Sequence, residues 1–222
     1  MDQRERKRKR AAEKRRREKE LKIRITILAV CGAVVLILLV RWAAGAIRAH
    51  RAGDGSASGV AEEELSLLSE GVLGYRDLVH EYAVEEGIED HEGVLLAIME
   101  VETKGEGNDV MQSSESKGLR RGTLGPEDSI AQACYYYAEL LKIAEEHECD
   151  EKSVIQAYNF GPGYLLFVGE NGGKHTQELA TEYAREKSGG ETVTYRHELA
   201  PDGWIYRYGN MYYEARVEEY LP

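Results

Sequence analysis

Apolar residues recur at steps of three and four along most of the chain beyond residue 60, which is the spacing of an amphipathic helix. In residues 61–87 this stripe consists of Leu65, Leu68, Val72, Tyr75, Leu78 and Val79. Further helices are expected at residues 91–103, 125–149, 150–160, 175–189 and 210–221. Two short segments, 191–196 and 203–209, favour extended structure. The pattern predicts an all-α domain, with a mainly helical α+β fold as the alternative.

The helical pattern is interrupted twice. Residues 105–126 are rich in Gly, Ser and Asn, and irregular segments of this length within a compact domain are usually functional. Gly161, Pro162 and Gly163 end the helix at 150–160. Asp150 marks the start of that helix, because Asp is a residue type that caps helix N-termini.

The N-terminal part differs from this helical domain, because residues 25–40 form an uncharged apolar run. It extends to residue 47 if Arg24 and Arg41 reach the membrane interfaces, which makes it long enough to span a bilayer. Residues 1–24 carry 13 basic and 5 acidic side chains, whereas residues 52–222 carry 13 and 35. Because positive charge stays on the cytoplasmic side, we predict a basic cytoplasmic tail (1–24), a single transmembrane helix (25–47) and an outer C-terminal part. A signal peptide cleaved near residues 43–46 is the alternative.

Residues 48–60 are small and polar and are predicted to form a linker, which leaves residues 61–222 as the folded domain. Cys134 and Cys149 in this domain could be bonded or free, because an outer location permits both. No group of side chains has the spacing of a metal site, so we expect no metal and no other cofactor. Membrane topology explains the basic tract, and no nucleic-acid partner is expected.

Two glutamates lie near the end of the helix predicted at 91–103. Glu102 continues the apolar stripe of that helix, on the face formed by Leu95, Ile98 and Met99. Burial disfavours the charged form of a carboxyl group, and one that keeps its proton near neutral pH can act as a general acid. A frayed helix end with Glu102 turned to water is the alternative. Glu100 lies about 200° around the helix from the stripe, so it is expected to be a solvated residue.

Three motifs follow one another along the domain: Glu102-Thr103, Met111-Gln112 and Ala157-Tyr158-Asn159-Phe160-Gly161. In this order they resemble the hallmark of the lytic transglycosylase and goose-type lysozyme superfamily. The segments LGPEDSI, NGGKHTQELA and YGNMYYEARVEEYL are similar to the lysozyme-like domain of Gram-positive cell-wall hydrolases, including the two-domain enzymes of conjugative elements. The resemblance covers nearly all of residues 61–222. It implies a small, mainly helical lysozyme-like fold with a cleft between helical lobes.

The resemblance also implies roles for individual residues. Glu102 would protonate the glycosidic oxygen, and Asp109 and Glu115 are the candidates for a second acid. Of the C-terminal tyrosines, Tyr212 or Tyr213 would face the cleft. The expected substrate-binding residues are Gln112, Ser113, Ser114, Tyr158, Asn159 and Tyr212.

The activity implied is cleavage of peptidoglycan glycan strands. Lysozymes use water, whereas lytic transglycosylases use one glutamate and a hydroxyl group of the sugar itself, which leaves 1,6-anhydro ends. We predict a muramidase that cuts between N-acetylmuramic acid and N-acetylglucosamine, with a lytic transglycosylase and a non-catalytic wall-binding module as alternatives. A membrane-anchored enzyme facing the cell wall would suit a secretion or conjugation apparatus. The Cys/His endopeptidase of two-domain relatives is expected to be absent, since the sequence ends at Pro222.

Overall fold

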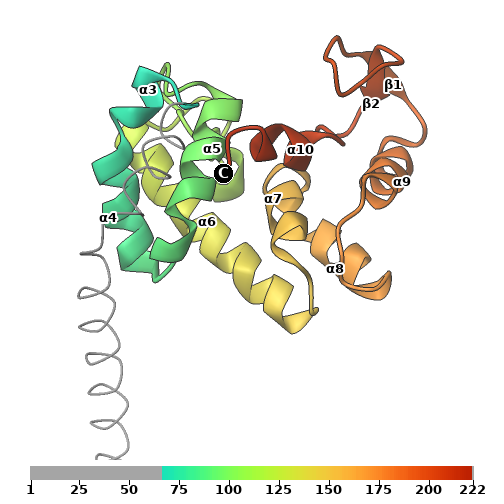
Figure 1. Ribbon diagram of the computed structural model, residues 1–222, viewed down its shortest axis with the longest axis horizontal. Coiled ribbons are helices and arrows are strands. Elements are labelled where there is room, and N and C mark those ends of the chain that lie inside the picture. Colours follow the sequence, from blue (N-terminus) through green and yellow to red (C-terminus); the bar gives the residue numbers. More distant parts are fainter. Residues whose placement is uncertain (1–66, 222) are drawn as a thin grey trace, which may run out of the picture. The chain divides into compact units, whose positions relative to one another are not determined.

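The computed structural model describes residues 67–221, which form a mainly helical domain with one small sheet (Figure 1). The helices are α3 (Glu70–Leu73), α4 (Arg76–Glu86), α5 (Glu92–Glu102), α6 (Pro126–Glu146), α7 (Glu151–Phe160), α8 (Gly163–Glu170), α9 (Gln177–Ser188) and α10 (Tyr213–Glu218). Two 3-10 turns, η1 (Glu89–His91) and η2 (Glu115–Lys117), lie in the connections. Strands β1 (Thr192–Thr194) and β2 (Trp204–Tyr206) pair antiparallel, with Val193 opposite Ile205. The prediction of a mainly helical fold is confirmed.

The predicted tail (1–24), span (25–47) and linker (48–60) lie outside the described residues. Within residues 67–221, none of the helices is long and apolar enough to cross a membrane.

The helix predicted at 61–87 is divided in the described part into α3 and α4, which meet at Gly74 and Tyr75. The reason is that α3 is bound to the end of α5. A Cβ atom on Gly71 would lie 2.4 Å from the Lys104 carbonyl oxygen, and the Ser69 hydroxyl donates to that same oxygen. Since α4 packs instead along α5 and α6, a single straight helix cannot make both contacts.

The segment after α7 also differs from the prediction. Gly161 ends α7 with a φ of +86°, as expected, but the chain resumes helical structure at once as α8. The apolar residues Tyr164, Leu165 and Val168 are buried there and stabilise this short helix. The N-cap at Asp150 is confirmed, since its side chain accepts a hydrogen bond from the Ser153 N–H.

Helix α5 is the most buried element of the domain, and this corrects the expectation for Glu100. Every residue from Val94 to Val101 is buried, and Glu100 is only 5% exposed. The face expected to meet solvent is covered by the start of α3, where the Ser69 N–H donates to the Glu100 carboxylate at 2.8 Å. The prediction for Glu100 was wrong because helical periodicity assumes that one face of the helix is exposed to solvent, whereas α3 covers that face here.

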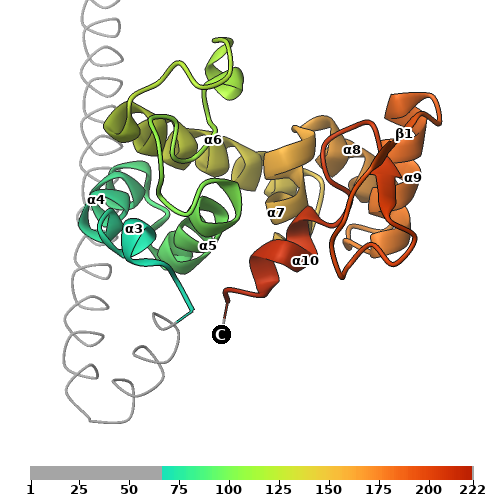
Figure 2. The same ribbon diagram turned by 90° about the horizontal axis from the view of Figure 1, so that it is seen from above.

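Helix α10 joins the two halves of the domain. Figures 1 and 2 show α3 to α6 on one side, α7 to α9 with the strands on the other, and α10 between them. It packs on both α5 and α7, and its residues Tyr213, Glu214 and Val217 are buried. The two cysteines of the described part, Cys134 and Cys149, are free thiols.

Candidate active site

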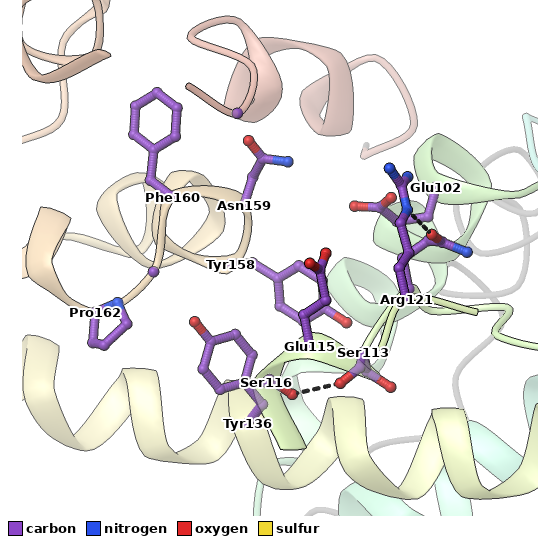
Figure 3. Close-up of a pocket in the computed structure, with 13 residues that line it drawn as sticks. Glu102, Ser113, Glu115, Ser116, Arg121, Tyr136, Tyr158, Asn159, Phe160 and Pro162 are labelled. Atoms are coloured by element: carbon purple, nitrogen blue, oxygen red, sulfur yellow. Dashed lines mark hydrogen bonds between the residues drawn. The ribbon is translucent and has the colours of Figure 1, made fainter. Parts of the chain in front are cut away.

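A pocket of about 650 Å³ opens at the C-terminal end of α5 (Figure 3). Its walls come from the long loop after α5, from α6 and from the end of α7. The lining residues are Glu102, Gln112, Ser113, Glu115, Ser116, Arg121, Tyr136, Tyr158, Asn159, Phe160, Gly161, Pro162 and Gly209. The pocket is therefore the place where the three motifs found in the sequence meet.

Glu102 is the last residue of α5 and lies partly buried in the pocket wall. Burial raises the pKa of its carboxyl group above the ordinary value. A hydrogen bond of 2.7 Å from the Tyr213 hydroxyl, and the positive charges of Arg121 and Arg216, offset part of that rise in pKa. The result is a carboxyl group that holds its proton more tightly than a solvated glutamate, with a donor ready to stabilise the charge once the proton has left.

Aromatic rings form one side of the pocket, as Figure 3 shows for Tyr136, Tyr158 and Phe160. The rings of Tyr158 and Tyr213 stack at 6.4 Å between centroids, and Tyr136 packs against Tyr158 at 5.6 Å. The Tyr158 hydroxyl donates to the Met111 carbonyl at 2.9 Å, so it holds the long loop rather than Glu102. Flat, partly apolar rings beside a carboxyl group suit a sugar, which has an apolar face and a polar rim.

Asp109 holds the long loop together from inside. Its carboxylate accepts hydrogen bonds from the N–H groups of Ser113, Ser114 and Gly122 and from the Ser129 hydroxyl, at 2.7–3.3 Å. Burial alone would raise the pKa of Asp109, but the hydrogen bonds from Ser114, Ser129 and Gly122 outweigh it and keep this pKa below its ordinary value. Asp109 is 3% exposed and does not line the pocket, so its chemistry is structural.

The loop anchored by Asp109 brings three functional side chains to the pocket. Gln112 adopts a left-handed backbone conformation (φ +48°) and accepts a 2.6 Å hydrogen bond from Arg121 Nε. Glu115 begins η2, is exposed, and within residues 67–221 its carboxylate has neither a hydrogen bond nor an ion pair. The pocket therefore contains a partly buried acid, a free carboxylate and a guanidinium group.

The segment after β2 closes the far end of the pocket. The Asn210 N–H donates to the Asn159 side-chain oxygen at 2.7 Å, and the Tyr208 hydroxyl donates to the Phe160 carbonyl at 2.9 Å. Gly209 lies so close that an added Cβ would be 2.4 Å from that same Asn159 oxygen. These contacts tie the start of α10 to α7 and so help to hold Tyr213 against Glu102.

The structure gathers most, but not all, of the residues predicted from the sequence. Glu102, Gln112, Ser113, Glu115, Tyr158 and Asn159 line the pocket. Ser114 does not, because it is fully buried and its hydroxyl accepts from the N–H groups of Thr123 and Leu124. Tyr212 does not line it either, and its neighbour Tyr213 is the residue that contacts Glu102.

Sequence reasoning missed several residues of the pocket: Ser116, Arg121, Tyr136, Phe160, Gly161, Pro162 and Gly209. Phe160 and Gly161 belong to a motif that was recognised, so its full length could have been assigned to the site. The sequence indicates a role for Arg121 only weakly, because the one clue is a basic residue within the long loop of an acidic domain. Gly209 carried none, since its role depends on a contact across 50 residues of sequence with Asn159.

Comparisons with known proteins agree with this geometry. A family model described as Lysozyme-like matches residues 69–221. The membrane protein YocA of Bacillus subtilis is 34% identical over 164 residues, which are 69% of this chain and 70% of YocA. The bifunctional muramidase/DL-endopeptidase CwlT of Bacillus subtilis is 34% identical over 140 residues, which are 62% of this chain and 42% of CwlT.

A solved structure shares the fold. It is described as similar to a lipoprotein of the NLP/P60 family, from Staphylococcus aureus, and superposes with a TM-score of 0.69 at 46% identity. The match covers 70% of this chain and 54% of that one, so the chain spans about half the length of that protein.

Proposed function

Because the chain belongs to the lysozyme-like family, we propose that it is a glycosidase of peptidoglycan, a muramidase in which Glu102 is the general acid. The observation that carries the proposal is the environment of Glu102. This carboxyl group opens onto the pocket, burial raises its pKa, and the Tyr213 hydroxyl donates to it. The printed name of CwlT, a muramidase, supports the same substrate class for a chain similar to it.

The proposed reaction begins with proton transfer from Glu102 to the glycosidic oxygen. Burial raises the pKa of Glu102, which favours the protonated form that a general acid needs, and general acid catalysis contributes about 10²–10⁴-fold to the rate. The Tyr213 hydroxyl then stabilises the carboxylate that remains, because hydrogen bonds to charged acceptors are stronger than those to neutral ones. Glu102 regains its proton from solvent after the leaving group has departed, and the proton of the attacking water goes to the second acid.

Glu115 is the second acid in this proposal, and Asp109 is not. Asp109 already accepts four hydrogen bonds inside the loop, so it has no free oxygen to orient a water. Glu115 lines the pocket with an exposed carboxylate, and such a group can activate water for hydrolysis. If Glu115 proves dispensable, a lytic transglycosylase that relies on Glu102 alone becomes the better assignment.

Zymography on gels containing purified cell wall tests the proposal. We expect Glu102→Gln to lower lysis by at least a hundredfold, because it keeps the shape of the side chain and removes the proton. Glu100→Gln is the matched control, since Glu100 lies two residues away on α5 and a glutamine oxygen can still accept from the Ser69 N–H. Wall binding without lysis by the wild-type protein would favour the non-catalytic wall-binding module instead.

The products distinguish the two reaction classes. Hydrolysis leaves a free reducing muramic acid, which gains two hydrogens on borohydride reduction, whereas the 1,6-anhydro end is lighter by one water and does not react. We expect reducible ends, and a strong loss of activity in Glu115→Gln. Anhydro ends together with a fully active Glu115→Gln variant would refute hydrolysis.

We also propose that the enzyme is anchored by residues 25–47 with its catalytic domain outside the cytoplasm, facing the wall. The basic tract before the apolar run supports this orientation, and YocA, which is similar over 69% of this chain, is described as a membrane protein. An anchor limits wall cleavage to the vicinity of the membrane, as a secretion or conjugation apparatus would require.

A further inference from the structure

Arg121 is the only basic residue among the described residues that line the pocket. Its surroundings are strongly acidic, because residues 67–221 contain 13 basic and 31 acidic side chains. Glu102 and Glu115 also line the pocket, but within residues 67–221 neither forms an ion pair with Arg121. The pocket therefore has one local positive charge in a domain whose overall field repels anions.

The side chain of Arg121 is held in place although it is exposed. Its Nε donates to the Gln112 side-chain oxygen at 2.6 Å, and Gln112 is in turn held by a hydrogen bond to the Asp109 carbonyl. Within residues 67–221, no hydrogen bond or ion pair engages the two terminal nitrogens of Arg121. A guanidinium group fixed through Nε, with its terminal nitrogens free, is arranged to bind a carboxylate through a pair of hydrogen bonds.

The position of this group relative to the reacting bond defines what it can recognise. Figure 3 shows Arg121 on the same side of the pocket as Glu102. Its charge acts on Glu102 directly. A carboxylate bound there would belong to the saccharide unit next to the glycosidic bond that Glu102 protonates, either to the sugar itself or to the peptide that it carries.

We infer that Arg121 is a specificity-determining residue that binds a carboxylate carried by the muramic acid unit at the cleaved bond. This inference rests on the proposed function, which it deepens by naming the charged group of the substrate. Muramic acid bears a lactyl group whose carboxylate is free when the stem peptide has been removed. When the peptide is present, its own carboxylates are the alternative source of the same charge.

The test compares substrates that differ only in charge. Glycan strands freed of peptides by an amidase carry the lactyl carboxylate, and coupling with methylamine and a carbodiimide converts it to a neutral amide. We expect the wild-type enzyme to cleave the charged strands about ten times faster than the amidated ones, on the scale of one charge-assisted hydrogen bond at an exposed site. The preference should shrink with added salt, because exposed charges are screened.

Variants of the loop locate the preference. Arg121→Gln should remove the preference, so that charged and amidated strands are cleaved at the same rate as each other. Arg121→Lys keeps the positive charge but cannot donate the pair of parallel hydrogen bonds that a guanidinium group donates. This variant should therefore keep part of the preference for charged strands. Arg120→Gln is the matched control, because Arg120 is exposed on the same loop and does not line the pocket, so the full preference should persist.

Peptide-bearing strands, with and without amidation, identify the source of the carboxylate. A preference limited to peptide-bearing strands assigns it to the stem peptide, and a preference in peptide-free strands assigns it to the lactyl group; both support the inference. Equal rates of the wild-type enzyme on charged and amidated strands would overturn it, as would an equal loss on both in Arg121→Gln. Neither of these outcomes affects the proposed function, which is tested separately by the Glu102→Gln variant and by the ends of the cleavage products.

Discussion

Replacing Gly209 by alanine should weaken both the fold and the site, because this glycine lies where two segments touch. An added Cβ would be 2.4 Å from the Asn159 side-chain oxygen and 2.8 Å from Cδ1 of Phe160. The Asn159 oxygen cannot move away without losing its hydrogen bond from Asn210. The Phe160 ring is confined by the rings of Tyr164, Tyr183 and Tyr208.

The expected loss of stability has three parts. Gly209 has a φ of +52°, where alanine is less stable than glycine by about 1 kcal/mol. Overpacking against Asn159 and Phe160 costs about 1–3 kcal/mol, and losing the hydrogen bond from Asn210 adds up to about 1 kcal/mol. A combined loss of about 2–5 kcal/mol lowers the melting temperature of a domain of this size by roughly 4–20 °C.

Thermal unfolding followed by circular dichroism measures this loss, and Gly203→Ala is the matched control. Gly203 also has a positive φ, of +72°, but an added Cβ there would meet nothing within 4 Å. The control should therefore lose only the conformational part, and it should keep full lytic activity. Equal losses of stability in the two variants would refute the close contact between Gly209 and α7.

Three further predictions concern the acid, the loop and the membrane. In Tyr213→Phe, the pKa of Glu102 should rise further because a hydrogen bond that lowers it is gone, so the alkaline limb of the pH–activity profile should move to higher pH; an unmoved limb would contradict this. Asp109→Asn should lower the free energy of unfolding by about 2 kcal/mol at pH 7. Since the pKa of Asp109 is depressed, its stabilisation is lost as the pH falls through that pKa, and urea unfolding in acid should show a smaller difference between variant and wild type. Protease added to wall-stripped cells should remove the C-terminal domain, and protection of that domain would exclude the proposed orientation.

Most of the helices were predictable because they have an apolar stripe of helical period, and the N-cap at Asp150 followed from its side-chain chemistry. The helix at 126–146 illustrates this, with Pro126 in its first turn and acidic residues beside it. The helix α8 was missed because its Gly-Pro-Gly start signals a turn, while its buried side chains stabilise helix all the same. Glu100 was assigned to the surface because periodicity describes one helix and says nothing of a second element that covers its other face.

The candidate site was predictable only as far as its motifs are local. Glu102 and Gln112 lie within one short stretch, so their order along the chain was informative. The hydrogen bond from Tyr213 to Glu102 joins residues 111 positions apart, and the choice between Tyr212 and Tyr213 depended on which side of α10 faces α5. Asp109 was a candidate second acid because it is a carboxylate in the loop that follows Glu102. Its structural role could not be predicted, because its four hydrogen-bond donors come together only in the folded domain.

The hydrogen bond between Tyr213 and Glu102 also has a consequence for biosynthesis. Chains emerge from the ribosome with their N-terminal parts leading. The helix that carries Glu102 therefore emerges before α10 has been synthesised. Until α10 docks between α5 and α7, Glu102 lacks the hydroxyl that donates to it and part of the burial that raises its pKa. The environment that raises the pKa of Glu102 is therefore complete only after α10 has been synthesised and has docked.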